Sequence, residues 1–295
     1  MKKKPAPARR RMGVLPVLVI VFFAGGVFAA WLIARYHAAP VEKKIAAPYS
    51  AGRNADAGAA AVAPPPAMPP KPGERGKRLA IIIDDIGLRR DPVEKLLAAG
   101  IPLTFSVMPD QPRTKELAAE IAAAGQEVML HLPMEPENDR INNPGAGALL
   151  VTEPDEDIRA AIRHDLGQVP QAKGVNNHMG SLFTRDERKM EVVLAELKAR
   201  NLYFVDSLTA PTSVGHAVAR RLGLKSAARR VFLDNDPSAE AIAQHLRLAI
   251  GLAVKEGAVV AIGHPYPATV AAIEKLKDEL VKAGVTPVFA SQVVR

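Results

Sequence analysis

The chain contains no cysteine, so no disulfide stabilises its folded part and no thiolate can serve as a nucleophile or metal ligand. Aromatic residues make up only 4% of the sequence, and the single tryptophan, Trp31, lies near the N-terminus. Aromatic rings are the usual stacking partners of nucleic-acid bases. The shortage of rings argues against base stacking, and the absence of disulfides means that stability must come from a buried core.

Positive charge is concentrated in the first quarter of the chain. The net charge is +8, but residues 1–76 hold 12 Lys and Arg against 3 Asp and Glu, whereas residues 77–295 hold 27 against 28. A basic segment without stacking residues offers nucleic acid only non-specific phosphate contacts. We therefore expect no nucleic-acid partner.

Residues 14–33 form an uncharged apolar run of about 20 residues, which is the length needed to cross a bilayer. Six basic residues precede it, and this asymmetry keeps the N-terminus in the cytoplasm. The alternative is a cleaved signal peptide ending near Ala29, but the run is longer than a usual signal core of about 7–15 residues. The sequence predicts a basic cytoplasmic tail at 1–13 and a transmembrane anchor at 14–33. The protein is then a single-pass inner-membrane protein with its C-terminal domain in the periplasm.

Residues 34–76 are rich in Ala, Pro and Gly and include the run Pro64-Pro65-Pro66. Such a composition buries little apolar surface and stays extended or disordered. We interpret this segment as a linker between the bilayer and a folded domain at 77–295.

From residue 77 onward, short apolar runs alternate with longer amphipathic ones, which is typical of parallel strands joined by helices. Both a closed or partly open β/α barrel and a doubly wound sheet fit this alternation. The expected strands are 79–83, 103–107, 127–130, a short one near Val175, 203–205, 231–233, 259–262 and 287–289. The expected helices are 91–99, 113–124, 154–168, 186–200, 214–222, 239–255 and 268–283.

Two adjacent acids, Asp84 and Asp85, follow the first expected strand. Neighbouring residues on an extended strand point to opposite sides, so one acid can face a metal ion and the other a water molecule. The alternative is that one caps the next helix and the other is solvated.

Histidines follow three other strands. His131 ends one strand and has Glu135 four residues on, whereas His264 ends another and is followed by Tyr266. His178 lies in a polar turn. Neutral imidazole is a good ligand for zinc and similar ions, and a histidine in a rigid loop suits a general acid. Taken singly, each is also compatible with a structural turn.

Polar side chains thus occupy six of about eight strand ends. The others in this set are Asn177, Ser181, Asp206, Ser207 and Asp234. The carboxyl ends of parallel strands meet at one rim, where active sites of α/β folds lie. This pattern predicts a metal-dependent hydrolase. By contrast, His164, His216 and His245 fall within expected helices among charged neighbours and are predicted to be surface groups.

The ordered series Ile-Asp-Asp-Ile-Gly, His-Leu-Pro-Met-Glu, Asn-Asn-His-Met-Gly-Ser and Ile-Gly-His-Pro-Tyr-Pro resembles the divergent polysaccharide deacetylase family over about 79–294. The resemblance implies a distorted (β/α) barrel of about seven to eight parallel strands. It also implies a divalent metal, expected to be zinc, held by one Asp and two His.

The resemblance assigns the metal ligands to Asp85 and His131, and the base to Asp84. Glu135 stands where ordinary deacetylases have their second metal His, so His178 would replace that ligand. His264 matches the general acid, and Arg229 or Arg230 would fill the place of the family's arginine.

These assignments imply deacetylation of an N-acetylated envelope glycan. Two alternatives remain open: a non-catalytic envelope protein that binds glycan or a cell-wall enzyme through the same groove, and hydrolysis of another amide or ester. The folded part has no tryptophan and few rings, among them Tyr203 and Tyr266, although glycan grooves usually offer aromatic platforms.

Overall fold

The computed structural model describes residues 76–145 and 147–295. The expected tail at 1–13, the expected anchor at 14–33 and nearly all of the expected linker lie outside these residues. Within the described ranges, no helix is both long enough and apolar enough to cross a membrane.

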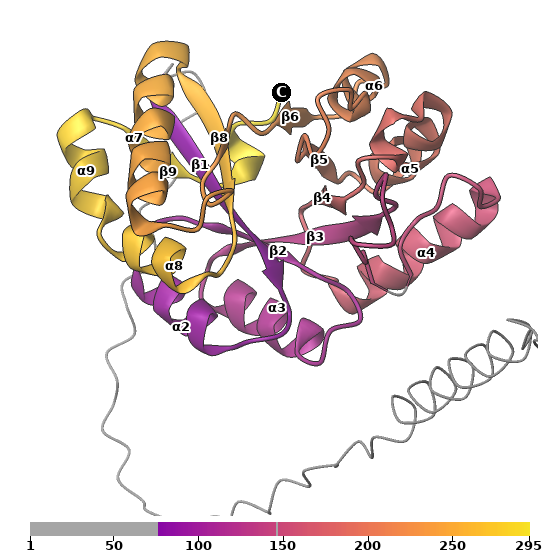
Figure 1. Cartoon of the computed structure of the whole chain (residues 1–295), viewed down its shortest axis with the longest axis horizontal. Coiled ribbons are helices and arrows are strands. Elements are labelled where there is room, and N and C mark those ends of the chain that lie inside the picture. The colour runs from indigo at the N-terminus through magenta and orange to yellow at the C-terminus, as the bar shows by residue number, and fades with distance from the viewer. Residues whose placement is uncertain (1–75, 146) are drawn as a thin grey trace, which may run out of the picture. The chain divides into compact units, whose positions relative to one another are not determined.

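A parallel sheet forms the centre of the fold (Figure 1). Its order is β6-β5-β4-β3-β2-β1-β8-β7, with β9 paired to β1. Consecutive strands are neighbours from β1 to β6, whereas a doubly wound sheet reverses direction at a switch point. The sheet is therefore of the barrel-like type. Its strands are β1 (Arg78–Ile86), β2 (Thr104–Val107), β3 (Glu127–Met134), β4 (Gly174–Met179), β5 (Tyr203–Asp206), β6 (Ser226–Ala228), β7 (Val231–Phe232), β8 (Ala258–Gly263) and β9 (Thr286–Val288).

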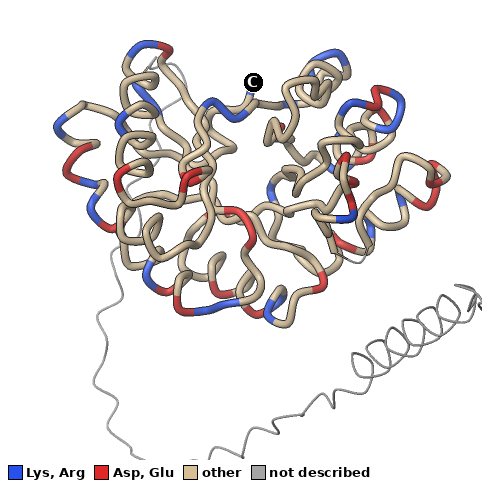
Figure 2. Tube along the Cα trace, viewed as in Figure 1, with Lys and Arg blue, Asp and Glu red and all other residues tan. Residues whose placement is uncertain are grey.

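Helices cover the outer face of this curled sheet (Figure 1). Acidic and basic residues are interspersed over this part of the chain, in keeping with its near-neutral charge (Figure 2). The helices are α2 (Asp91–Ala98), α3 (Thr114–Ala123), α4 (Asp155–Gln168), α5 (Glu187–Ala199), α6 (Gly215–Arg221), α7 (Ala239–Glu256), α8 (Pro267–Glu274) and α9 (Leu276–Ala283). The helix expected at 268–283 is thus divided at Lys275, where no glycine or proline marks the break.

The strands are buried on both faces, as their continuous apolar runs indicate. On β1, Ile81 and Ile83 pack into the large core beneath the helices, whereas Ala80 and Ile82 belong to a second apolar cluster that contains no residue of α2–α9. The second cluster includes Val293, near the C-terminus. The inside of the curl is therefore a packed core.

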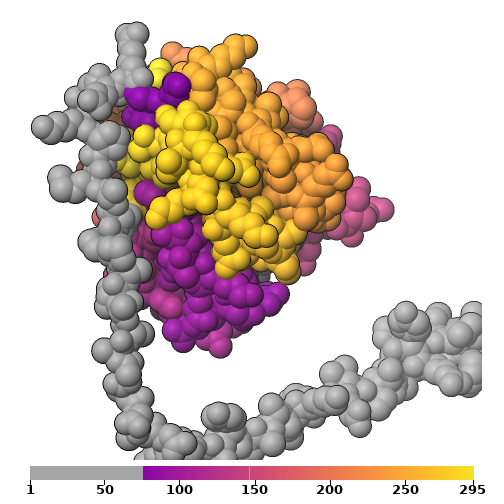
Figure 3. Space-filling view, turned by 90° about the vertical axis from the view of Figure 1, so that its left-hand side faces the viewer, coloured from indigo at the N-terminus to yellow at the C-terminus, as the bar shows by residue number. Residues whose placement is uncertain are grey.

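The sheet has nine strands rather than the seven to eight expected, and in the described residues its edges β6 and β7 are not paired with each other. The chain crosses between the edges at residues 229–230, where the Arg229 N–H donates to the Asp206 carbonyl and the Arg230 N–H to the Val260 carbonyl. The added strand, β6, has the sequence Ser-Ala-Ala, which lacks the apolar run that would mark it. Figure 3 shows the C-terminal helices beside the β1–α2 segment, so both ends of the described chain contribute to one outer face.

Gly174, the first residue of β4, provides a test of the packing between strands. A Cβ atom at this position would lie 2.4 Å from the ring of Tyr203, its partner on β5. We expect Gly174→Ala to lower the free energy of unfolding by about 1–3 kcal/mol, because the ring must move away. Gly167→Ala is the matched control: it lies in α4 with nothing within 4 Å of the added Cβ, and alanine there should stabilise by about 0.5–1 kcal/mol. Chemical denaturation measures both, and an unchanged Gly174→Ala midpoint would contradict the close contact.

Candidate metal centre

A cavity of about 440 Å³ opens at the carboxyl ends of the strands and holds most of the expected site residues. Asp84 and Asp85 reach it from β1, His131 from β3 and His178 from β4, while His264 follows β8. The remainder of its wall is formed by Asn177, Met179, Ser207, Leu208, Thr209, Arg229, Phe232, Asn235, Ile262 and Tyr266.

A bulge at the end of β1 turns both of its acids toward the cavity. The register between β1 and β2 shifts between Ile83 and Ile86, and Asp85 has a φ of 57°. For a residue other than glycine this left-handed conformation costs roughly 1–2 kcal/mol. The expectation that the two acids point to opposite sides is therefore wrong, because a bulge replaces the regular alternation. The strain is located where the two carboxylates converge.

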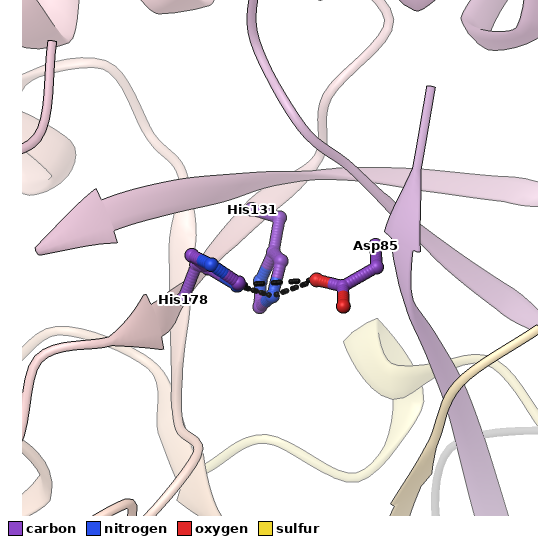
Figure 4. A group of neighbouring side chains, drawn as sticks. All are labelled: Asp85, His131 and His178. Atoms are coloured by element: carbon purple, nitrogen blue, oxygen red, sulfur yellow. Dashed lines mark hydrogen bonds and ion pairs between the residues drawn. The ribbon is translucent and has the colours of Figure 1, made fainter. Parts of the chain in front are cut away.

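Three side-chain atoms meet on one side of the cavity (Figure 4). Asp85 Oδ1 lies 3.3 Å from His131 Nε2 and 3.1 Å from His178 Nδ1. The two histidine nitrogens lie 3.1 Å from each other. One carboxylate oxygen and two imidazole nitrogens form a donor set that Zn²⁺ and related ions accept.

Asn176 determines which nitrogen of His131 faces this group. His131 Nδ1 lies 2.8 Å from Asn176 Oδ1, while the amide nitrogen of Asn176 donates to Asp84 Oδ1 at 2.8 Å. The amide oxygen can only accept, so Nδ1 carries a proton and Nε2 is the ring nitrogen that faces Asp85 and His178. Metal-binding histidines are commonly oriented by such a partner.

The electrostatics of the triad fit a divalent cation. Asp85 Oδ1 is buried, and apart from His131 and His178 it has no polar partner in the described part of the chain. Burial alone would raise the pKa of Asp85, but His131 and His178 outweigh it and hold the pKa well below its usual value. The carboxylate is thus ionised, and its Oδ1 faces two ring nitrogens at one point, where a divalent cation can bind all three atoms. The residues present therefore fit a divalent metal.

Asp84 and His264 line the same cavity, and the pKa of each is raised above its ordinary value. Asp84 is 3% exposed, and burial raises its pKa above the ordinary value for Asp. Burial would lower the pKa of His264, but its hydrogen bond with Asp234 and the charges of Asp84 and Asp85 raise it to about 9. At neutral pH His264 therefore carries a proton that it can donate.

Asp234 fixes the orientation of His264. Its Oδ1 accepts from His264 Nδ1 at 3.0 Å, and its Oδ2 accepts from the His264 backbone N–H at 2.6 Å and from the Thr269 hydroxyl at 2.7 Å. The other ring nitrogen, Nε2, lies 3.8 Å from Asp85 Oδ2. Asp234 thus holds the imidazole with Nε2 toward the triad.

Of the two arginines, Arg229 lines the cavity. Its guanidinium donates to the Ser207 and Leu208 carbonyls at 2.6 and 2.8 Å and lies 4.7 Å over the Phe232 ring. Arg230 instead pairs with Glu256 at 2.7 Å. Through these two hydrogen bonds Arg229 stabilises the loop after β5, which forms part of the cavity wall.

Besides Asp234, three expected site residues lie outside the cavity wall. Glu135 accepts from the Val151 N–H at 2.7 Å, and Ser181 accepts from the Glu137 N–H at 2.9 Å. Asp206 accepts from the Ser213 hydroxyl at 2.7 Å and the His216 N–H at 2.9 Å, at the start of α6. These three side chains therefore stabilise loops. Glu135, which the resemblance places where ordinary deacetylases have their second metal-binding histidine, accepts a hydrogen bond from the backbone of residue 151.

Asn177 and Ser207 form a link between β4 and the loop after β5. The amide oxygen of Asn177 accepts from the Ser207 N–H at 2.9 Å, and the Ser207 hydroxyl accepts from the Asn176 amide at 3.2 Å. Asn176 is the residue that sequence reasoning passed over as a site residue. Alternation along a strand could have identified it, since it lies two residues from His178.

We expect Asn176→Leu to lower the affinity for the metal ion by about 10–100-fold, which is the usual effect of removing the partner of a metal-binding histidine. The variant keeps the side-chain volume but loses the acceptor for His131 Nδ1 and the donor to Asp84. Competition with a calibrated chelator measures the affinity. Unchanged affinity in a folded variant would contradict the orienting role.

Comparisons with known proteins identify relatives of this chain. Residues 81–294 match the divergent polysaccharide deacetylase family. The uncharacterized protein YibQ of Escherichia coli (strain K12) is 38% identical over 200 residues, which are 68% of this chain and 62% of YibQ. An uncharacterized protein of Haemophilus influenzae is 30% identical over 197 residues, 67% of this chain and 70% of that protein. The match thus spans about three fifths of the length of YibQ.

A solved structure shares the fold. The uncharacterized protein ATU2773 from Agrobacterium tumefaciens C58 has a TM-score of 0.72 at 23% identity and covers 76% of this chain and 92% of that one. The extent of the family match, together with these relatives, confirms the resemblance expected from the motifs. This chain belongs to the divergent polysaccharide deacetylase family.

Proposed function

We propose that this chain is a metal-dependent hydrolase that removes acetyl groups from an N-acetylated envelope glycan. The observation that carries the proposal is the convergence of Asp85, His131 and His178 beside Asp84 and a protonated His264 in one cavity. Metal-dependent amide hydrolysis uses a metal site together with a general base and a general acid, and the cavity offers residues for all three.

Each part of the site has a role in this proposal. Asp85, His131 and His178 would hold a divalent ion, which when bound would lower the pKa of a water molecule and polarise the amide carbonyl. Asp84 accepts the proton of the attacking water, helped by a pKa that burial raises above the ordinary value for Asp. His264 donates its Nε2 proton to the departing nitrogen, while Asp234 keeps Nδ1–H bound. We propose zinc as the ion, because one carboxylate and two imidazoles are typical zinc ligands.

Tyr266 supports the assignment to a sugar substrate. The residue is 44% exposed, and its ring stacks on His264 with 5.3 Å between the ring centroids and 24° between the planes. A ring held in this way offers an apolar face to a sugar next to the proposed acid. The cavity volume also falls in the usual range for small-ligand sites, about 300–1,000 Å³.

The proposal is tested with zinc-loaded full-length protein and two substrates, chitooligosaccharides and peptidoglycan fragments, with released acetate as the readout. We expect acetate release that a chelator abolishes and added zinc restores. Glycan binding without acetate release across both substrates would contradict the enzymatic proposal and favour the binding module.

We also propose that residues 14–33 anchor the protein in the inner membrane and place residues 77–295 in the periplasm. The support comes from the basic residues before the apolar run. A phosphatase that is active only outside the cytoplasm, fused after Arg295, should be active in cells, and the fusion should stay in the membrane fraction. A soluble form beginning near residue 30 would show a cleaved signal instead.

A further inference from the structure

A second group of metal-binding side chains lies away from the cavity. Asp110 belongs to the loop between β2 and α3, whereas His164 and Asp165 lie in the C-terminal half of α4. One possible ligand atom from each lies within 4.8 Å of those of the other two. None of the three lines the cavity that holds the triad.

Asp165 is the distinctive member of this group. It is 2% exposed, and its Oδ2 is buried without a hydrogen-bond partner in the described part of the chain. No lysine or arginine among the described residues forms an ion pair with it either. A buried carboxylate without a partner is costly, and such groups are normally paired or bound to a cation.

The other two side chains face each other across a single amide. Gln168 Nε2 donates to Asp110 Oδ1 at 2.5 Å and contacts His164 Nε2 at 2.9 Å. Asp110 Oδ1 and His164 Nε2 are 3.5 Å apart. The Gln168 amide thus lies against both atoms, and a cation bound to Asp110 and His164 would displace it.

We propose that Asp110, His164 and Asp165 form a second site for a divalent cation, which we take to be zinc. Two carboxylate oxygens and one imidazole nitrogen suit this ion, and exposed His164 leaves an entry path from solvent. Burial and the Asp110 charge also raise the pKa of Asp165 to about 7, an unfavourable electrostatic situation that a cation relieves.

The position of the site indicates a structural role. The ion would fix the loop after β2, which begins at the cavity side of a core strand, to the outer helix α4. The second ion would contact none of the residues to which we assign a catalytic role. Zinc bound at this second site should therefore raise the melting temperature, whereas acetate release should require only the ion held by Asp85, His131 and His178.

The test isolates the second site by removing the first. In the full-length Asp85→Ala/His178→Ala variant, stripped of metal, calorimetric titration with zinc chloride should give about one bound ion per chain. Zinc should also raise its melting temperature by several degrees. Adding Asp165→Asn or His164→Ala to this background should lower the affinity at least ten-fold and remove the thermal shift.

Asp157→Asn in the same background is the matched control, because it removes an exposed acid from the first turn of α4. It should leave both measurements unchanged. Asp165→Asn need not destabilise the metal-free protein, because it removes an uncompensated buried charge, so folding can be checked without zinc. The proposal is overturned if the Asp85→Ala/His178→Ala variant binds no zinc, or if its zinc persists in Asp165→Asn and His164→Ala. Either result leaves the proposed deacetylase untouched, since that is read from acetate release.

Discussion

His178→Ala is expected to lower the affinity for the catalytic metal ion at least ten-fold and to abolish acetate release at limiting zinc. The reason is that a triad with two imidazoles and one carboxylate loses one of three protein ligands. Asp85→Asn should have the same double effect, because an amide does not supply the anionic oxygen that His131 and His178 face. Affinity is measured by chelator competition and activity by acetate release at several zinc concentrations.

His216→Ala is the control for this change. It removes an imidazole from α6 outside the cavity wall, while its backbone N–H still donates to Asp206. It should retain both metal and activity. A His178→Ala variant that keeps wild-type affinity for the catalytic ion would show that His178 does not replace the ligand missing at Glu135.

Asp84→Asn is expected to lower turnover by about 10²–10⁴-fold while the catalytic metal stays bound, which is the usual contribution of a positioned base. Asparagine keeps the shape of the side chain and its place beside the amide of Asn176, but it cannot accept a proton from water. His264→Ala should have a similar effect by removing the acid. Turnover and metal content are measured on the same samples.

Measuring turnover and metal content together distinguishes a catalytic role of Asp84 and His264 from a purely structural one. Loss of metal together with turnover in Asp84→Asn would move Asp84 into the metal-binding group. Unchanged turnover in His264→Ala, with the metal retained, would remove the proposed acid. The proposed mechanism requires that metal content and turnover respond separately at Asp84 and together at Asp85.

Continuous apolar strands were the features most readily predicted from the sequence. The runs before Asp84, His131 and His264 predicted β1, β3 and β8, because strands buried on both faces need apolar residues throughout. The polar residues at the ends of these strands then predicted a site at one edge of the sheet. Strand β6 was missed because its sequence, Ser-Ala-Ala, lacks the apolar run that marked the other strands.

The details of the site depended on geometry that is not encoded locally. The bulge that turns Asp84 and Asp85 into one cavity arises from the pairing of β1 with β2. Asn176 was overlooked because amides are ordinary turn formers, and its role appears only when His131 lies opposite it in register. His164 was expected at the surface and is exposed there, but its neighbour Asp165 is buried against the fold.

Elemental analysis of the full-length protein beside its Asp85→Ala/His178→Ala variant tests the central claim most directly. Both are purified after growth with added zinc, and the second site contributes equally to each. We predict that the wild-type chain holds about one more ion than the double variant. Equal metal content in the two proteins would contradict the assignment of Asp85, His131 and His178 as a metal centre.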